Sequence, residues 1–261
     1  MPASNAHWGA PIHLDGGIDE RALTLDRGLG PVPGLLWTPA GSTGRTPLVL
    51  IGHGGSGAKD AANNLAVRDY LTGERGIATL AIDGPAHGDR GPVTDTSHPA
   101  YSEMWRNPRV VDEMNEDWRS SLDAALALGE FDASAVGYYG LSMGTMFGLP
   151  FVAAEPRIAV AVLGLCGVRG TSVDRSGIAA RLAADAPRVT CPLMYHVQWD
   201  DERFERESAF ELYGLLSAAD KRLQSTPGLH GGVSVEARET LRSFLATRIE
   251  TIHAPAPATA R

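Results

Sequence analysis

The feature that most constrains this chain is the pentapeptide Gly-Leu-Ser-Met-Gly at residues 140–144, in which glycines flank a serine at both second-neighbour positions. The apolar run at residues 135–139 is typical of a short buried strand, and residues 145–154 predict an apolar helix. A serine between a strand and a helix stands on a sharp turn with its hydroxyl exposed. Because side chains at the glycine positions would collide where strand and helix meet, the pattern favours a strained turn at Ser142.

Composition limits the class of protein. The 261 residues are 43% hydrophobic and 21% charged, which fits one soluble α/β domain. The net charge of −8 argues against nucleic acid or an anionic membrane as a partner. No apolar run is long enough to span a membrane, and residues 1–10 lack the features of a secretory signal. Since Cys166 and Cys191 also lie in apolar runs typical of buried free thiols, we expect a cytoplasmic protein.

The pattern around the pentapeptide matters because 30 glycines make a chance match a real alternative. Apolar runs predict strands at residues 47–51, 77–82, 135–139, 158–163, 193–197 and 222–224. Amphipathic or apolar segments predict helices at residues 60–71, 110–128, 145–154, 176–186, 205–219 and 233–249. This alternation predicts a parallel sheet with helices on both faces, and residues 12–37 predict antiparallel edge strands. We expect a single domain over residues 1–253 and a disordered Ala/Pro-rich tail over residues 254–261.

Polar and glycine-rich segments follow the predicted strands. Ligands of a parallel sheet bind beyond the carboxyl ends of its strands, so these segments are the candidates for a site. In chain order they are residues 52–57, residues 83–90, Ser142, the pair Asp200 and Asp201, and His230. A serine, an acid and a histidine are thus expected at one edge of the sheet.

These motifs, in this order, resemble the α/β-hydrolase family over roughly residues 47–249. The stretch at residues 83–90 and the small size are most similar to compact esterases and dienelactone-hydrolase-like members. The resemblance implies an α/β-hydrolase fold with a mostly parallel, eight-stranded sheet and a Ser–His–acid triad. It implies Ser142 as the nucleophile and His230, on the loop after the last strand, as the base. No cofactor is implied.

The acid of the triad is one of two neighbours, Asp200 and Asp201. In an extended segment their side chains point to opposite sides, so only one reaches His230. The resemblance favours Asp201, because the family acid is followed within a few residues by an apolar residue, here Phe204. The proline that often comes next is replaced by Glu205. We therefore expect Asp201 as the catalytic acid and Asp200 as a solvated loop residue or helix cap.

The resemblance also implies an oxyanion hole formed by the backbone N–H groups of Met143 and Gly55. The glycine-rich residues 52–57 could instead cradle a phosphate, but no Gly-Lys-Ser/Thr follows them. Family members use histidines at the positions of His53 and His87 to bind the loop backbone. Neither histidine has further ligands at metal-binding spacing, so we expect no metal site.

Residues 91–107 form an irregular insertion that contains Tyr101 and Trp105. These two side chains are candidates for the substrate pocket, and the alternative is a packed surface loop. Where many family members carry a lid after the sixth strand, this chain has room for one helix at residues 176–186. A minimal lid and an open, shallow site are therefore expected.

The resulting hypothesis is a serine hydrolase that cleaves a small carboxylic ester or lactone through an acyl-enzyme intermediate. A thioester hydrolase or an acyltransferase with the same triad remains open. A non-catalytic homologue that binds a small molecule is an alternative of another class. The expected partner is a small-molecule ester, with no nucleic acid and no membrane, and a homodimer is left open.

Overall fold

The computed structural model describes residues 5–27 and 30–254, and in this part of the chain ten strands form one sheet. Their order is β1-β3-β4-β6-β5-β7-β8-β9-β10, with β2 paired to β3. The strands are β1 (Ala6–Trp8), β2 (Ile12–Leu14), β3 (Ile18–Asp26), β4 (Pro31–Pro39), β5 (Thr46–Gly52), β6 (Ala78–Ile82), β7 (Phe131–Gly140), β8 (Ile158–Gly164), β9 (Leu193–Gln198) and β10 (Lys221–Thr226). The strands from β6 to β10 in this order are parallel, while β3 and β4 pair antiparallel to their neighbours.

The mostly parallel sheet and the antiparallel N-terminal strands are confirmed, but the expected number of eight strands is wrong. Two three-residue strands are added at the N-terminal side. β1 pairs with β3 from Leu23 to Leu25, and β2 pairs with β3 from Ile18 to Glu20. Both use the outer edge of the long β3, whose other edge pairs with β4. Segments this short contain too few alternating residues to be recognised in the sequence.

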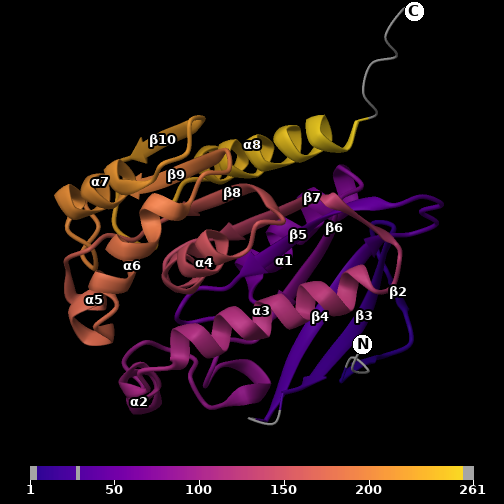
Figure 1. The fold of residues 1–261 in the computed structure, drawn as a ribbon, viewed down its shortest axis with the longest axis horizontal. Coiled ribbons are helices and arrows are strands. Elements are labelled where there is room, and N and C mark those ends of the chain that lie inside the picture. Colours follow the sequence, from indigo (N-terminus) through magenta and orange to yellow (C-terminus); the bar gives the residue numbers. More distant parts are fainter. Residues whose placement is uncertain (1–4, 28–29, 255–261) are drawn as a thin grey trace, which may run out of the picture.

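Helices cover both faces of the sheet (Figure 1). One face packs against α2 (Pro99–Arg106), α3 (Val110–Leu126), α4 (Met143–Ala154), α5 (Thr171–Ser176), α6 (Ala179–Asp185) and α7 (Arg206–Leu215). The other face packs against α1 (Ala62–Arg68), the π-helical turn Asp69–Glu74 and α8 (Val235–His253). Alternation along β5 explains the two cores, because Leu48 and Leu50 belong to the first and Val49 and Ile51 to the second.

Two expectations about the segments near the site need correction. The helix predicted at residues 176–186 is two shorter helices, α5 and α6. Gly177 ends α5 in the left-handed conformation, with φ of 68°, which glycine adopts without strain. The insertion at residues 91–107 is not wholly irregular, because α2 lies within it. His98 caps α2 by accepting a hydrogen bond from the Ala100 N–H, and Pro99 follows as a favourable first residue.

Other expectations concern the termini, the thiols and the membrane. The predicted disordered tail lies outside the described residues apart from Ala254. Both cysteines are free, and Cys166 is buried as expected, whereas Cys191 is only half-buried. Across residues 5–27 and 30–254, no helix combines the length and apolarity needed to cross a membrane.

Candidate active site

Ser142 occupies a strained turn between β7 and α4. Its backbone has φ of 59° and ψ of −121°, a conformation that residues with a side chain rarely adopt. The turn is tied to the next strand, because Ser142 N–H donates to Gly164 O at 3.0 Å. Thr145 Oγ1 strengthens this tie, lying 2.8 Å from Gly140 O and accepting from Gly164 N–H at 2.8 Å.

The two glycines of the pentapeptide are required by close backbone contacts. A Cβ atom on Gly140 would lie 2.5 Å from Gly144 O, and one on Gly144 would lie 2.6 Å from Gly52 O. Gly52 ends β5, the strand beside β7. The helix after the serine therefore starts against the end of the neighbouring strand, which only glycine permits.

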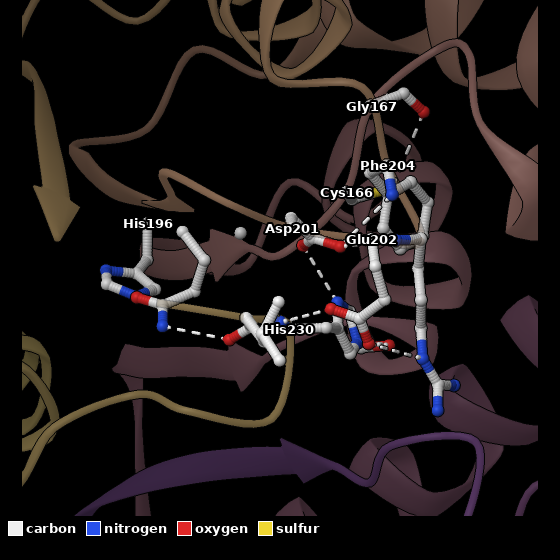
Figure 2. Close-up of polar contacts among 12 residues, drawn as sticks. Cys166, Gly167, His196, Asp201, Glu202, Phe204 and His230 are labelled. Carbon is white, nitrogen blue, oxygen red and sulfur yellow. Dashed lines mark hydrogen bonds and ion pairs between the residues drawn. The ribbon is translucent and has the colours of Figure 1, made fainter. Parts of the chain in front are cut away.

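Three side chains from distant loops form a continuous hydrogen-bonded chain. His230 Nε2 lies 2.8 Å from Ser142 Oγ, and His230 Nδ1 lies 2.8 Å from Asp201 Oδ2. Figure 2 shows the His230–Asp201 contact. A carboxylate only accepts hydrogen bonds, so Nδ1 carries the proton and Nε2 is free to accept the serine hydroxyl. The arrangement allows the imidazole to remove the Ser142 proton.

The Asp201 side chain is only 4% exposed, and both of its oxygens are held. While Oδ2 faces His230, Oδ1 accepts from the N–H groups of Arg203 at 2.8 Å and Phe204 at 3.1 Å. Asp200 is exposed and accepts from Gly228 N–H at 3.3 Å. Of the two adjacent acids, the structure therefore brings Asp201 to the histidine.

The loop that carries His230 is held by two residues that the sequence did not single out. Glu202 Oε2 accepts from His230 N–H at 2.8 Å (Figure 2). Gln198 Nε2 donates to Leu229 O at 3.0 Å, and its Oε1 lies 3.1 Å from Nε2 of the buried His196. Gln198 is the last residue of an apolar strand, and no sequence motif around it indicates a role at the site. Both bonds to the loop hold the peptide unit between Leu229 and His230, one through its C=O and the other through its N–H.

The loop at residues 52–57 brings Gly55 to the cavity that Ser142 also lines. Gly55 lines the cavity at Ser142, and its N–H makes no hydrogen bond within the described residues. His53 accepts from Gly84 N–H through Nε2 at 2.8 Å, so its Nδ1 carries the proton that binds Gly54 O at 2.8 Å. Because C=O and N–H point in opposite directions across a trans peptide, this bond orients the Gly55 N–H away from His53.

Three further features belong to this corner of the site. His87 Nε2 lies 3.0 Å from Gly55 O, so both histidines bind the loop backbone, as the resemblance implied. Burial lowers the pKa of His53 to about 4, which keeps its ring neutral. Met143 is the first residue of α4, and its N–H therefore has no acceptor within the helix.

A cavity of about 250 Å³ opens at Ser142 and His230. Tyr101 and Trp105, the predicted pocket residues, are buried and are not among the described residues that line it. Tyr101 packs against the Gly55 loop, and the Trp105 ring stacks on Phe147 with 4.7 Å between centroids. Their role in the pocket stays a prediction.

Two other observations concern the rest of the molecule: a second hollow and the placement of side chains that could bind a metal. A larger hollow of about 730 Å³ lies between β10 and α8, lined by residues such as Arg222 and Phe244, and contains none of the three hydrogen-bonded residues. No group of three or more His, Cys, Asp or Glu side chains in residues 5–27 and 30–254 is arranged to hold a metal ion.

No protein-family model and no curated protein matches this sequence. Among solved structures, a cold-adapted esterase from an Arctic intertidal metagenomic library is 38% identical, with a TM-score of 0.82, over 93% of this chain and 99% of that one. Acetyl xylan esterase from Paenibacillus sp. R4 is 19% identical, with a TM-score of 0.73, over 94% of this chain and 89% of that one. Acetyl Xylan Esterase 1 from Thermoanaerobacterium sp. JW/SL YS485 is 13% identical, with a TM-score of 0.72, over 94% of this chain and 88% of that one.

The latter two structures are too distant in sequence to show more than the shared fold. The first is similar in sequence over nearly the whole length of both chains. Together with the sheet order and the strained serine turn, this similarity shows that the chain belongs to the α/β-hydrolase family, alongside the cold-adapted esterases.

Proposed function

We propose that the protein is a serine hydrolase that cleaves small carboxylic esters or lactones through an acyl-enzyme intermediate. The observation that supports this most is the continuous contact from Ser142 Oγ through His230 to Asp201, with both distances at 2.8 Å. The similarity of the protein to a cold-adapted esterase supports carboxylic esters as the substrate class.

In the first half of the proposed reaction, Ser142 Oγ attacks the ester carbonyl carbon while His230 Nε2 takes the hydroxyl proton. Asp201 stabilises the imidazolium that forms. Negative charge develops on the carbonyl oxygen, where the N–H groups of Met143 and Gly55 are proposed to donate to it. The intermediate collapses, the bond between the acyl carbon and the alcohol oxygen breaks, and His230 gives the proton to the departing alkoxide.

In the second half, water attacks the acyl carbon and His230 takes a proton from it. A second tetrahedral intermediate forms in the same site. Its collapse releases the carboxylic acid and returns the proton to Ser142. A lactone follows the same steps, except that the alcohol stays attached to the acyl chain.

Labelling with a fluorophosphonate tests the covalent step. The expected result is one adduct on Ser142, located by mass spectrometry, and its loss in Ser142→Ala. Ester turnover in Ser142→Ala should fall by about a millionfold. The exposed Ser217 provides the control, because Ser217→Ala should retain both label and turnover. A folded wild-type protein that takes up no label would instead favour a non-catalytic binding protein.

A further inference from the structure

Two arginines contribute to the lining of the cavity at Ser142. Arg203 follows Asp201 on the acid loop, and Arg238 is the fourth residue of α8, at the end of its first turn. None of the described residues that line this cavity is an aspartate or a glutamate. The protein as a whole carries a net charge of −8, so a cationic lining at this one place runs against its overall charge.

Arg238 has no charged partner in the described part of the chain. Its Nε donates to Val233 O at 3.2 Å, and its Nη1 donates to Asn63 Oδ1 at 3.0 Å. Both acceptors are neutral, and Nη2 donates no hydrogen bond within the described residues. The half-buried guanidinium is therefore held in place without charge compensation.

The start of α8 adds to this positive character. Val233 and Arg238, on either side of the first turn of this 19-residue helix, both line the cavity. A helix N-terminus carries a partial positive charge from its unpaired N–H groups. Glu236 lies in the first turn and offsets part of this charge, but it and Glu239 line the hollow between α8 and β10 and not this cavity.

Arg203 lies on another wall of the cavity. Its Nη1 donates to Thr96 Oγ1 at 3.2 Å, and its Nε lies 3.7 Å from Glu202 Oε1. Glu202 therefore offsets part of the charge of Arg203, and the exposed Asp95 lies close enough to interact with it. Arg238 remains the stronger candidate to bind an anion.

We propose that the ester substrate carries a second, anionic group of the carboxylate type, which Arg238 binds while Arg203 adds to the positive potential. This inference rests on the proposed function, since it names the substrate class of the same site. A guanidinium whose Nη2 makes no other hydrogen bond can donate a strong, charge-assisted hydrogen bond to a carboxylate. Neutral esters of the same shape would leave the cation without a partner and should react more slowly.

Two matched pairs of esters test the proposal. Monomethyl glutarate and methyl 5-methylhexanoate have the same shape, but only the first carries a carboxylate on its acyl part. The pair 4-acetoxybutanoate and 4-methylpentyl acetate places the same difference on the alcohol part. We expect kcat/KM for the anionic ester to exceed that of its neutral partner by about tenfold or more in at least one pair. The pair that shows the advantage identifies the part of the substrate that Arg238 binds.

The variants Arg238→Gln and Arg242→Gln remove the same charge from the same helix. Arg242 donates to Ala66 O at 3.0 Å and does not line this cavity. We expect the anionic-to-neutral ratio to fall towards one in Arg238→Gln and to persist in Arg242→Gln. The ratio cancels any general loss of folded enzyme. It should also decrease with rising salt, since ions screen the attraction.

The outcomes separate the two proposals. If the neutral esters are hydrolysed at least as well in both pairs, or Arg238→Gln keeps the ratio of the wild type, the anionic substrate is refuted and the serine hydrolase stands. If the wild type hydrolyses no ester and takes up no fluorophosphonate, both proposals are refuted.

Discussion

Asp201 Oδ2 lies 2.8 Å from His230 Nδ1, whereas the neighbouring Asp200 is exposed and binds the N–H of Gly228. The two carboxylates differ because the chain turns directly after Asp201, whose other oxygen accepts from the N–H groups of Arg203 and Phe204. This turn holds the Asp201 carboxylate at Nδ1 of the histidine ring, in a position that Asp200 does not share.

We therefore expect Asp201→Asn to lower ester turnover by up to about ten-thousandfold, since an amide neither fixes the His230 tautomer nor stabilises its cation. Asp200→Asn is the matched control and should retain turnover within a few-fold. Steady-state kinetics on a nitrophenyl acetate substrate measures both variants. The opposite ranking would transfer the role to Asp200.

The second prediction concerns the close approach of α4 to β5. In Gly144→Ala the new Cβ would lie 2.6 Å from Gly52 O, so the backbone has to move. We expect unfolding free energy to fall by about 1–3 kcal/mol and turnover to fall with it, because the Ser142 turn shifts. Gly214→Ala, where no atom lies within 4 Å of the added Cβ, is the control. Equal thermal midpoints and equal turnover for the two variants would contradict this account.

The third prediction concerns the pH dependence of stability. The pKa of His53 is about 4 in the folded protein, because burial disfavours its charged form, against an ordinary value of 6.5. Above pH 6.5 His53 is neutral in both the folded and the unfolded protein, so its burial costs no proton. As pH falls from 6.5 to 4 the unfolded protein binds a proton that the folded protein does not, and the free energy of unfolding decreases. The difference in pKa corresponds to about 3 kcal/mol of unfolding free energy.

Urea unfolding at pH 7 and at pH 4 measures this effect in the wild type and in His53→Asn. Asparagine does not titrate, so the stability gap between the two proteins should narrow by about 3 kcal/mol at the lower pH. His7→Asn changes an exposed histidine and is the control. A gap for His53→Asn that is the same at both pH values would show that this ring does not limit stability in acid.

The fourth prediction concerns acyl-chain length. A cavity of about 250 Å³ buries a short acyl chain, and each methylene left in water forgoes about 0.8 kcal/mol. We expect kcat/KM for neutral nitrophenyl esters to peak at about two to six acyl carbons. Val233 lines the cavity, so Val233→Ala should move the peak towards longer chains.

Val235→Ala provides the comparison, because Val235 lies two residues further on and is 64% exposed. It should leave the chain-length profile unchanged. A wild-type maximum at long fatty acyl esters would contradict a small pocket, and equal profiles for the two valine variants would exclude Val233 from the acyl site.

The sequence by itself was sufficient for the α/β architecture and for the turn that carries Ser142. These features are local: the apolar runs set the strands, and the glycines at residues 140 and 144 mark a close approach of strand and helix. The order of the polar segments also placed His230 beside Ser142, because the carboxyl ends of parallel strands meet at one edge of the sheet. The same local reasoning predicted edge strands within residues 12–37 but missed β1, and it did not separate the three-residue β2 from β3, since both short strands depend on pairing with the outer edge of β3.

The resemblance to the family favoured Asp201 over Asp200, but the contact with the histidine, the bonds that hold the histidine loop and the charge around the serine depend on the tertiary structure. The first depends on how the chain turns after Asp201, which alternation along a strand does not determine. The others depend on partners that are distant in the sequence, such as Arg238 and Asn63, which are 175 residues apart. The residues next to an arginine in the sequence do not show which distant residues will contact it. Whether its charge is paired therefore depends on the folded sheet, which brings the distant segments together.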